Sequence, residues 1–104
     1  MTVRDMLYLT TVEDEKSITK AAAKLFVAQP ALSQCVQRVE KELGVELFVR
    51  TISGVQPTAE GLCFLAFARQ TLLAHRNMQR QLEDIRNAEG GEVLLGLTGT
   101  QATY

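Results

Sequence analysis

The polar side chains between Gln29 and Gln37 have the types and the spacing to pair with the edges of DNA bases. Gln29, Ser33 and Gln37 recur every four residues, and Gln34 lies beside them. On a helix, side chains four residues apart lie on one face. Amides and hydroxyls can pair with base edges in a major groove that is wide enough to admit a helix. The alternative is an ordinary solvated surface, although such a surface usually carries Glu and Lys, as residues 40–42 do.

The segment from Phe26 to Leu43 is predicted to hold these polar groups on a helix. Pro30 suits the first turn, because that turn leaves its backbone donors unpaired and the fixed φ of proline matches a helix start. Gly44 is typical of the residue that ends a helix. Apolar residues repeat with the helical period and predict a buried stripe opposite the polar face. This stripe consists of Leu32, Val36, Val39 and Leu43.

Two shorter helices are predicted before this one. The first spans Val3 to Glu15, and the second spans Ile18 to Phe26 with Ser17 as its N-cap. Lys20 and Lys24 lie one turn apart, on a face away from the apolar side of the second helix. In a helix-turn-helix the first of the two helices crosses the DNA backbone, where lysines can meet phosphates. The alternative for each lysine is a purely solvating role.

The segment after Gly44 predicts a short β-hairpin, or wing. Apolar and polar residues alternate from Val45 to Arg50, and Ser53-Gly54 marks a turn. Arg50 at the edge of the hairpin is a candidate for a phosphate or minor-groove contact. It could instead keep a small edge strand soluble.

A long helix is predicted from Ala59 to about Ala88, capped by Thr58. A helix of this length exceeds what a 100-residue globule covers, so its first turns should close the core and its later turns should pack on a second copy. The alternative is an amphipathic helix that covers a larger domain. The expected pairing positions are Leu65, Leu72, Met78, Leu82 and Ile85.

The predicted organisation has three parts: a DNA-binding domain at 1–58, a linker and dimerisation helix at 59–89, and a hinge with a first strand at 90–104. The apolar segment 92–98 resembles a buried strand of a parallel sheet, which would belong to a further domain. The fold class expected from these elements is mainly α.

Composition places limits on the function. The chain has 104 residues, 46% of them apolar, and a net charge of −1, which predicts one small domain without a general attraction for nucleic acid. Basic and acidic residues are balanced up to Pro57, so any DNA binding must come from individually placed charges. Without a membrane-spanning run or a signal peptide, the chain is expected to be cytoplasmic and to have no membrane partner.

Other chemistries find little support in the sequence. His75 is the only histidine, so a histidine metal cluster is excluded, no catalytic motif is present, and the chain is not expected to be an enzyme. Cys35 and Cys63 lack metal-ligand spacing and fit reduced thiols. A thiol-responsive regulator is an alternative, but Cys35 lies beside the buried stripe, where thiols are inert. Another is an interaction module that uses the long helix without touching DNA.

A larger set of positions resembles the N-terminal winged helix-turn-helix and linker helix of the LysR-type transcriptional regulators, from residue 1 to about 90 without a gap. The matching positions are Ser17, Ala21-Ala22, Leu25, Gln29 to Ser33, Val36, Val39-Glu40, Leu43-Gly44, Leu47-Phe48, Arg50, Pro57-Thr58 and Gly61. Their order and spacing make the resemblance more specific than a bare helix-turn-helix pattern.

The resemblance implies a bacterial regulator that binds double-stranded DNA as a dimer, often as a tetramer. It implies no cofactor in this chain, and a small-molecule effector for a C-terminal domain. By position, Gln29, Pro30 and Ser33 match family residues that meet the major groove, Gln34 occupies a variable reading position, and Arg50 matches the wing arginine.

The chain also departs from the family pattern. Ala28 stands where the family commonly has Ser or Thr, so the usual cap and phosphate contact should be missing. Ser53 replaces a frequent basic residue of the wing, and Pro57 replaces a frequent Leu. These changes predict weaker phosphate anchoring and a shallower salt dependence of binding.

Overall fold

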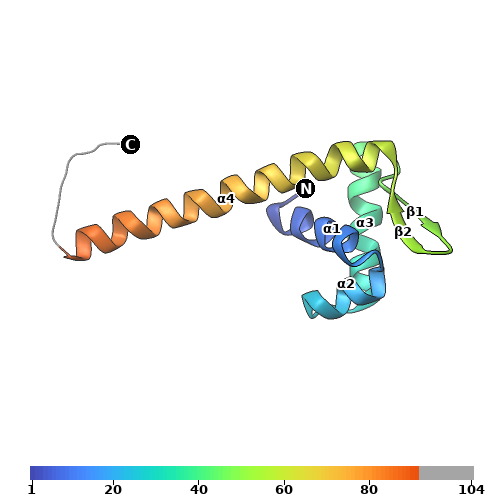
Figure 1. Ribbon diagram of the computed structural model, residues 1–104, viewed down its shortest axis with the longest axis horizontal. Coiled ribbons are helices and arrows are strands. Elements are labelled where there is room, and N and C mark those ends of the chain that lie inside the picture. The colour runs from blue at the N-terminus through green and yellow to red at the C-terminus, as the bar shows by residue number, and fades with distance from the viewer. Residues whose placement is uncertain (92–104) are drawn as a thin grey trace. The chain divides into compact units, whose positions relative to one another are not determined.

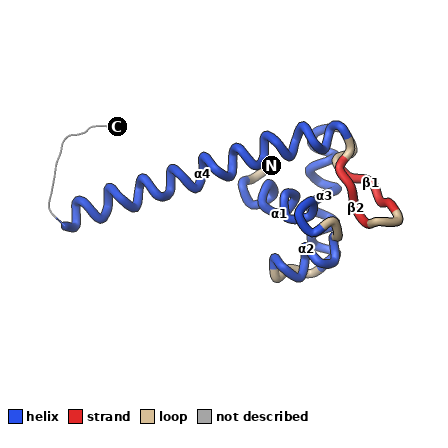
Figure 2. Tube along the Cα trace, in the orientation of Figure 1, coloured by secondary structure: helices blue, strands red, loops and turns tan. Residues whose placement is uncertain are grey.

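Four helices and one two-stranded hairpin make up residues 1–91, the part of the chain that the computed structural model describes (Figure 1). The elements are α1 (Val3–Glu15), α2 (Ile18–Leu25), α3 (Gln29–Leu43), β1 (Phe48–Thr51), β2 (Gly54–Pro57) and α4 (Ala59–Gly91). Helices predominate, as the tube view also shows (Figure 2). The predicted class, a mainly α winged helix-turn-helix with a long final helix, is confirmed.

Local signals explain where the first two helices begin and end. Thr2 and Asp5 form a capping box at the start of α1, in which each side chain accepts a hydrogen bond from the other residue's backbone. Ser17 caps α2 by accepting from the Lys20 backbone at 3.1 Å. Helix α2 ends at Leu25, because Phe26 turns into the left-handed region with φ 59°. The predicted end at Phe26 was therefore one residue too late.

Helix α3 starts without a side-chain cap. Its N-cap is Ala28, which has no oxygen to offer, and Pro30 lies in the first turn. At the other end Gly44 takes φ 75° and closes the helix through its backbone N–H to Glu40. The predicted helix is confirmed with its end at Leu43, but it begins at Gln29, three residues after the start of the predicted segment at Phe26.

The wing is held at both sides by hydrogen bonds from its backbone N–H groups, to a side-chain carboxylate on one side and to a backbone carbonyl on the other. Its strands are antiparallel, with Arg50 opposite Val55. On one side, Glu40 of α3 accepts from the Leu47 backbone at 2.7 Å. On the other side, the Val55 N–H donates to the Lys16 carbonyl at the end of α1, at 3.1 Å. The wing therefore lies beside the junction of α1 and α2 (Figure 1).

The core belongs to a compact unit that spans Met1–Leu72. Within α3 the predicted stripe is buried at its first three positions, but Leu43 in the last turn is 42% exposed. The core residues are Met6, Leu9, Val12, Ala21, Ala22, Leu32, Cys35, Val36, Val39, Leu47, Val55, Phe64, Leu65 and Ala68. The compact unit thus includes the first turns of α4, up to Leu72, and these turns help to close the core.

The prediction that Leu65 pairs with a second copy is wrong. The Leu65 side chain is only 2% exposed and packs in the core of its own unit. Leu72 is partly buried against the same core. A side chain that is enclosed within one chain cannot also cover another, so Leu65 leaves the set of pairing positions.

Acidic side chains at the end of α1 connect it to two other helices. Arg69 of α4 pairs with Glu13 at 2.6 Å and with Asp14 at 2.8 Å, and Lys24 of α2 pairs with Glu15 at 3.2 Å. Exposed pairs of this kind contribute little individually. Together they give these acids a structural use at a helix end where the dipole alone disfavours them.

The second unit begins at Leu73, and its described part consists of the remaining turns of α4. Large apolar side chains are exposed along it: Leu73, Met78, Leu82 and Ile85. Within the described residues, no helix is both long enough and apolar enough to span a bilayer. The predicted strand at 92–98 lies outside the described residues.

Candidate nucleic-acid interface

The polar face of α3 is partly ordered by its own hydrogen bonding. The Gln29 amide nitrogen donates to the Ser33 hydroxyl at 2.8 Å. Both side chains are partly exposed, whereas Pro30, Gln34 and Gln37 are exposed. The bond leaves the Gln29 carbonyl oxygen and its second N–H free, which is the donor and acceptor pair that an amide offers to a base.

Two adjoining hollows connect this face to the wing. The first, of about 140 Å³, is lined by Ser33 and Gln37 of α3 and by Arg50 of β1. The second, of about 210 Å³, is lined by Gln29 and again by Arg50. Ile18 and Val55 line both hollows. The structure thus brings three of the predicted base-reading residues and the predicted wing arginine onto one concave surface, while Pro30 and Gln34 lie outside the two hollows.

The predicted phosphate-contacting residues differ in their surroundings. Lys20, Lys24 and Arg50 are all exposed. Lys24 is already paired with Glu15 at 3.2 Å, so part of its charge is neutralised within the chain. Within the side chains described, up to residue 88, Lys20 and Arg50 form no ion pair. These two therefore remain the better placed of the three for an external anion.

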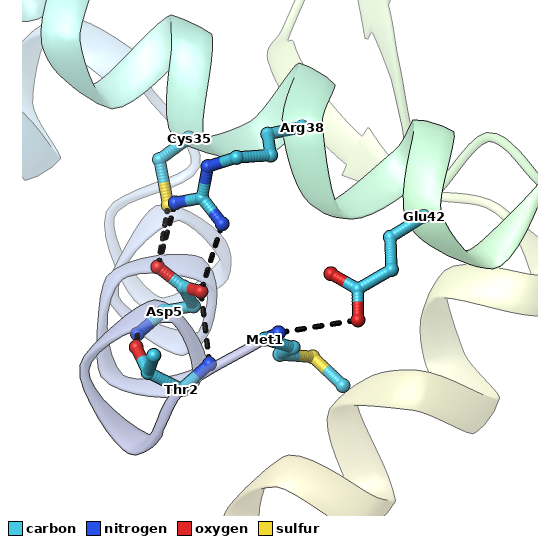
Figure 3. A network of polar contacts seen from close by, with 6 residues as sticks. All are labelled: Met1, Thr2, Asp5, Cys35, Arg38 and Glu42. Carbon is cyan, nitrogen blue, oxygen red and sulfur yellow. Dashed lines mark hydrogen bonds and ion pairs between the residues drawn. The ribbon is translucent and has the colours of Figure 1, made fainter.

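A buried carboxylate fixes α3 against α1 (Figure 3). Asp5 is only 4% exposed and accepts two hydrogen bonds from the Arg38 guanidinium, at 3.1 and 2.9 Å. It also accepts from the Thr2 backbone and from the Cys35 thiol at 3.5 Å. The Arg38 hydrogen bonds hold the pKa of Asp5 well below its usual range, against the opposing effect of burial.

The same network makes Cys35 a poor nucleophile. Burial and the neighbouring Asp5 carboxylate raise the pKa of the Cys35 thiol to about 11. Only the thiolate reacts readily, so oxidation at this position is disfavoured at neutral pH. This argues against the thiol-responsive alternative, as far as it relied on Cys35. Cys63 is exposed, and no other cysteine accompanies it within the described residues.

Sequence reasoning missed several residues that position the interface. Asp5 could have been found, because the spacing Thr2-x-x-Asp5 is a capping signature. Its pairing with Arg38 carried no local signal, and neither did the bond from Glu40 to the wing. Lys16, which lines the second hollow, was also missed.

The described residues include no cluster of side chains suited to binding a metal ion. Among residues 1–91, no three or more His, Cys, Asp or Glu side chains gather in an arrangement that could hold a metal ion. The surface offers neutral amides, hydroxyls and separate cations, together with the Glu40 carboxylate, which accepts hydrogen bonds from the Leu47 and Phe48 backbone.

Comparisons with known proteins agree with this geometry. Residues 3–62 match the family model described as bacterial regulatory helix-turn-helix protein, lysR family. The transcriptional regulator YraN of Bacillus subtilis is 30% identical over all of this chain, which covers 36% of that protein. The regulator YnfL of Escherichia coli is 36% identical over 94% of this chain, which covers 33% of YnfL. The chain thus spans about a third of the length of these relatives.

Solved structures show the same fold. The BenM DNA-binding domain in complex with catB site 1 DNA matches with a TM-score of 0.79 and 38% identity, covering 83% of this chain and 97% of that one. The CbnR DNA-binding domain in a DNA complex matches with a TM-score of 0.72 and 35% identity, covering 82% and 99%. The fold is that of a winged helix-turn-helix domain of LysR-type regulators, and the chain belongs to the lysR family of bacterial regulatory helix-turn-helix proteins.

Proposed function

We propose that this chain is a sequence-specific DNA-binding domain of a LysR-type transcriptional regulator. The observation that carries the proposal is the concave surface on which Gln29, Ser33 and Gln37 of α3 meet Arg50 of the wing. Hydrogen-bonding groups without charge suit base edges, and a cation beside them suits the phosphate backbone. The DNA complexes of BenM and CbnR support the assignment. Such a domain acts in the cytoplasm, by binding and without catalysis.

In the proposed complex α3 lies in the major groove of duplex DNA. Gln29, Ser33 and Gln37 face the bases, and Pro30 and Gln34 contact the groove from the exposed side of the first turns. Lys20 and Arg50 hold the backbone, with Lys24 in a lesser role because of its pairing with Glu15. The buried Asp5 keeps α3 in register with α1, so that the face stays aligned.

Assembly as a dimer, or as a tetramer of two dimers, is part of the proposal. Exposed apolar residues on a single helix need a partner, and Met78, Leu82 and Ile85 follow one another at intervals of four and three residues, the spacing of a helix-pairing stripe. Leu72 at its partly buried position can contribute at one end. Two copies would present two recognition helices to two half-sites. Sensing of a small-molecule effector, which the resemblance implies for a C-terminal domain, stays a prediction.

The roles of α3 and the wing are separable by mutation. Gln29→Ala should cost about 1 to 3 kcal/mol of discrimination between the preferred site and random DNA, because it removes a base contact. Arg50→Ala should weaken both DNAs alike and lower the slope of log K against log salt by about 0.9 per protomer, because it removes a phosphate contact. Fluorescence anisotropy with the two duplexes at several salt concentrations measures both quantities.

Gln70→Ala is the matched control, since Gln70 is an exposed glutamine of α4 that lines neither hollow. It should change neither discrimination nor the salt slope. If Gln29→Ala and Arg50→Ala had identical effects on specific and random DNA, the assignment of base reading to α3 and of phosphate binding to the wing would be wrong.

A further inference from the structure

We propose that the second hollow, between the α1–α2 junction and the wing, is the seat for one phosphodiester of the DNA backbone, with Lys16 and Arg50 as its cations. The proposal rests on the proposed DNA binding and adds a site and a residue to it. The start of α3 offers no side-chain hydroxyl for such a contact, because its N-cap is Ala28.

The hollow is built by contacts between distant segments. The Lys16 carbonyl accepts from the Val55 N–H of β2 at 3.1 Å. Gly54 takes φ 118°, and a Cβ there would lie 2.4 Å from the same carbonyl oxygen. Only glycine permits this approach. The wing is thereby fixed against the α1–α2 junction, and the two cations are carried by backbone segments that are bonded to each other.

The lining of the hollow suits an anion. Besides Lys16 and Arg50 it includes the hydroxyl residues Ser17, Thr19 and Thr51, and among the described residues no Asp or Glu lines it. The Thr51 hydroxyl already donates to the Gly54 carbonyl at 2.9 Å, so Ser17 and Thr19 are the hydroxyl residues left to donate to an anion. A phosphodiester carries one negative charge and oxygen acceptors, so cations and hydroxyl donors are the groups that bind it.

The two cations are also free to bind. Four other cations of the Met1–Leu72 unit have carboxylate partners: the Met1 amine with Glu42, Lys24 with Glu15, Arg38 with Asp5, and Arg69 with Glu13 and Asp14. Within the described side chains, Lys16 and Arg50 have none. Both charges are therefore available to an external anion.

The position of the hollow agrees with a backbone contact. Its lining includes Gln29, and Arg50 also lines the neighbouring hollow, with Ser33 and Gln37. A phosphate held there would therefore lie next to the bases that α3 faces. Half or more of the hydrogen bonds in protein–DNA complexes go to the backbone and fix the register of the protein on the duplex. The contact from Lys16 would thus help to fix the register of the protein on the duplex, and with it the base that Gln29 faces.

The test compares Lys16→Gln with Lys24→Gln, which removes the same charge from a lysine that is paired with Glu15 and lies outside the hollow. Each variant is titrated with the preferred and the random duplex at several salt concentrations. Lys16→Gln should weaken binding to both duplexes and lower the salt slope by about 0.9 per protomer. Lys24→Gln should change the slope by clearly less.

A scan of duplexes with single methylphosphonate substitutions locates the contact, because each substitution neutralises one phosphate. One position should weaken wild-type binding while adding no further loss in Lys16→Gln. Absence of such a position, or equal slopes for wild type and Lys16→Gln, would overturn the proposal while leaving DNA binding intact. If the wild-type chain bound neither duplex, the proposed function itself would fail.

Titration with inorganic phosphate, followed by amide NMR, separates a free anion from the DNA backbone. We expect no saturable shifts at Lys16, Thr19 and Thr51 with inorganic phosphate, and clear shifts with duplex. Saturation by inorganic phosphate without any Lys16-dependent phosphate position in the duplex would show a free-anion site and would contradict the proposed seat.

Discussion

Gly61→Ala is expected to lower the free energy of unfolding by about 2 to 3 kcal/mol, the upper part of the range of about 1 to 3 kcal/mol that extra volume in a close-packed contact costs. A Cβ at Gly61 would lie 2.0 Å from the Leu47 carbonyl oxygen. That oxygen cannot move away easily, because it also accepts from the Thr58 N–H at 2.9 Å. Relief would require α4 to shift from the start of the wing. Urea unfolding followed by circular dichroism measures the loss.

Gly44→Ala is the control for this experiment. Gly44 has φ 75°, but a Cβ there would meet no atom within 4 Å. Only the left-handed backbone penalty applies, about 1 kcal/mol. If Gly44→Ala proved as damaging as Gly61→Ala, backbone conformation and not the approach to Leu47 would limit glycine replacement, and the proposed contact of α4 would lose its support.

Asp5→Asn should have the next largest effect, about 2 kcal/mol of unfolding free energy at neutral pH, because charge-assisted hydrogen bonds to a buried carboxylate are lost. Asp5 connects the start of α1 to Arg38 of α3, and it is 4% exposed. The variant should also affect the DNA-binding surface, because α3 loses a contact that fixes its orientation against α1. We expect weaker discrimination between DNA sites in the folded variant.

The pH dependence distinguishes this carboxylate from others. The pKa of Asp5 lies well below its unfolded value of about 4. Its contribution is therefore complete above that value and is lost as the pH falls toward the folded pKa. The difference in stability between wild type and Asp5→Asn should be large at pH 7 and should shrink below pH ~4, as denaturant unfolding at several pH values can show.

Glu42→Gln serves as the matched control within the network of Figure 3. Glu42 pairs with the Met1 amine at 3.1 Å, but its side chain is 46% exposed. Exposed pairs contribute little, so this variant should change stability only slightly. A pH-independent difference between wild type and Asp5→Asn would mean that the carboxylate charge is not what holds α1 against α3.

Local signals predicted most of the fold. The span of α1 and the end of α3 follow from local apolar spacing and from Gly44, which ends α3 as expected. Ser17 begins α2 as expected. Contacts between distant residues left no such signal. The pairing of Asp5 with Arg38 depends on how α1 and α3 pack, and that packing is set by the whole core.

The predictions for the burial of Leu43 and for the exposure of Leu65 were wrong for the same reason. Periodicity shows that a helix has an apolar side, but it does not show what covers each turn. Leu43 continues the stripe of α3 into a last turn that is 42% exposed, and Leu65 continues the apolar side of α4 into a turn that its own core encloses. Burial is decided by the neighbouring elements and therefore needs the structure.

The type of the candidate site could be predicted from the sequence, but only some of the residues that line it could. The neutral polar face of α3 and the wing arginine could be read directly, because spacing and residue type carry the information. Lys16 could not be identified from the sequence. Its place beside the wing depends on the hydrogen bond from the Val55 N–H to the Lys16 carbonyl and on the close approach of Gly54 to that carbonyl. The pairing of Lys24 with Glu15, on which its proposed lesser role depends, likewise left no local signal in the sequence.

The central claim is that this chain reads duplex DNA as an assembly of two copies. A titration of the chain into a labelled duplex from its own upstream intergenic region, against a scrambled duplex, tests it at two salt concentrations, with the mass in solution recorded alongside. We predict tighter binding to the upstream duplex by a dimer, with both affinities falling as salt rises. Equal, weak binding to both duplexes by a monomer would contradict the account.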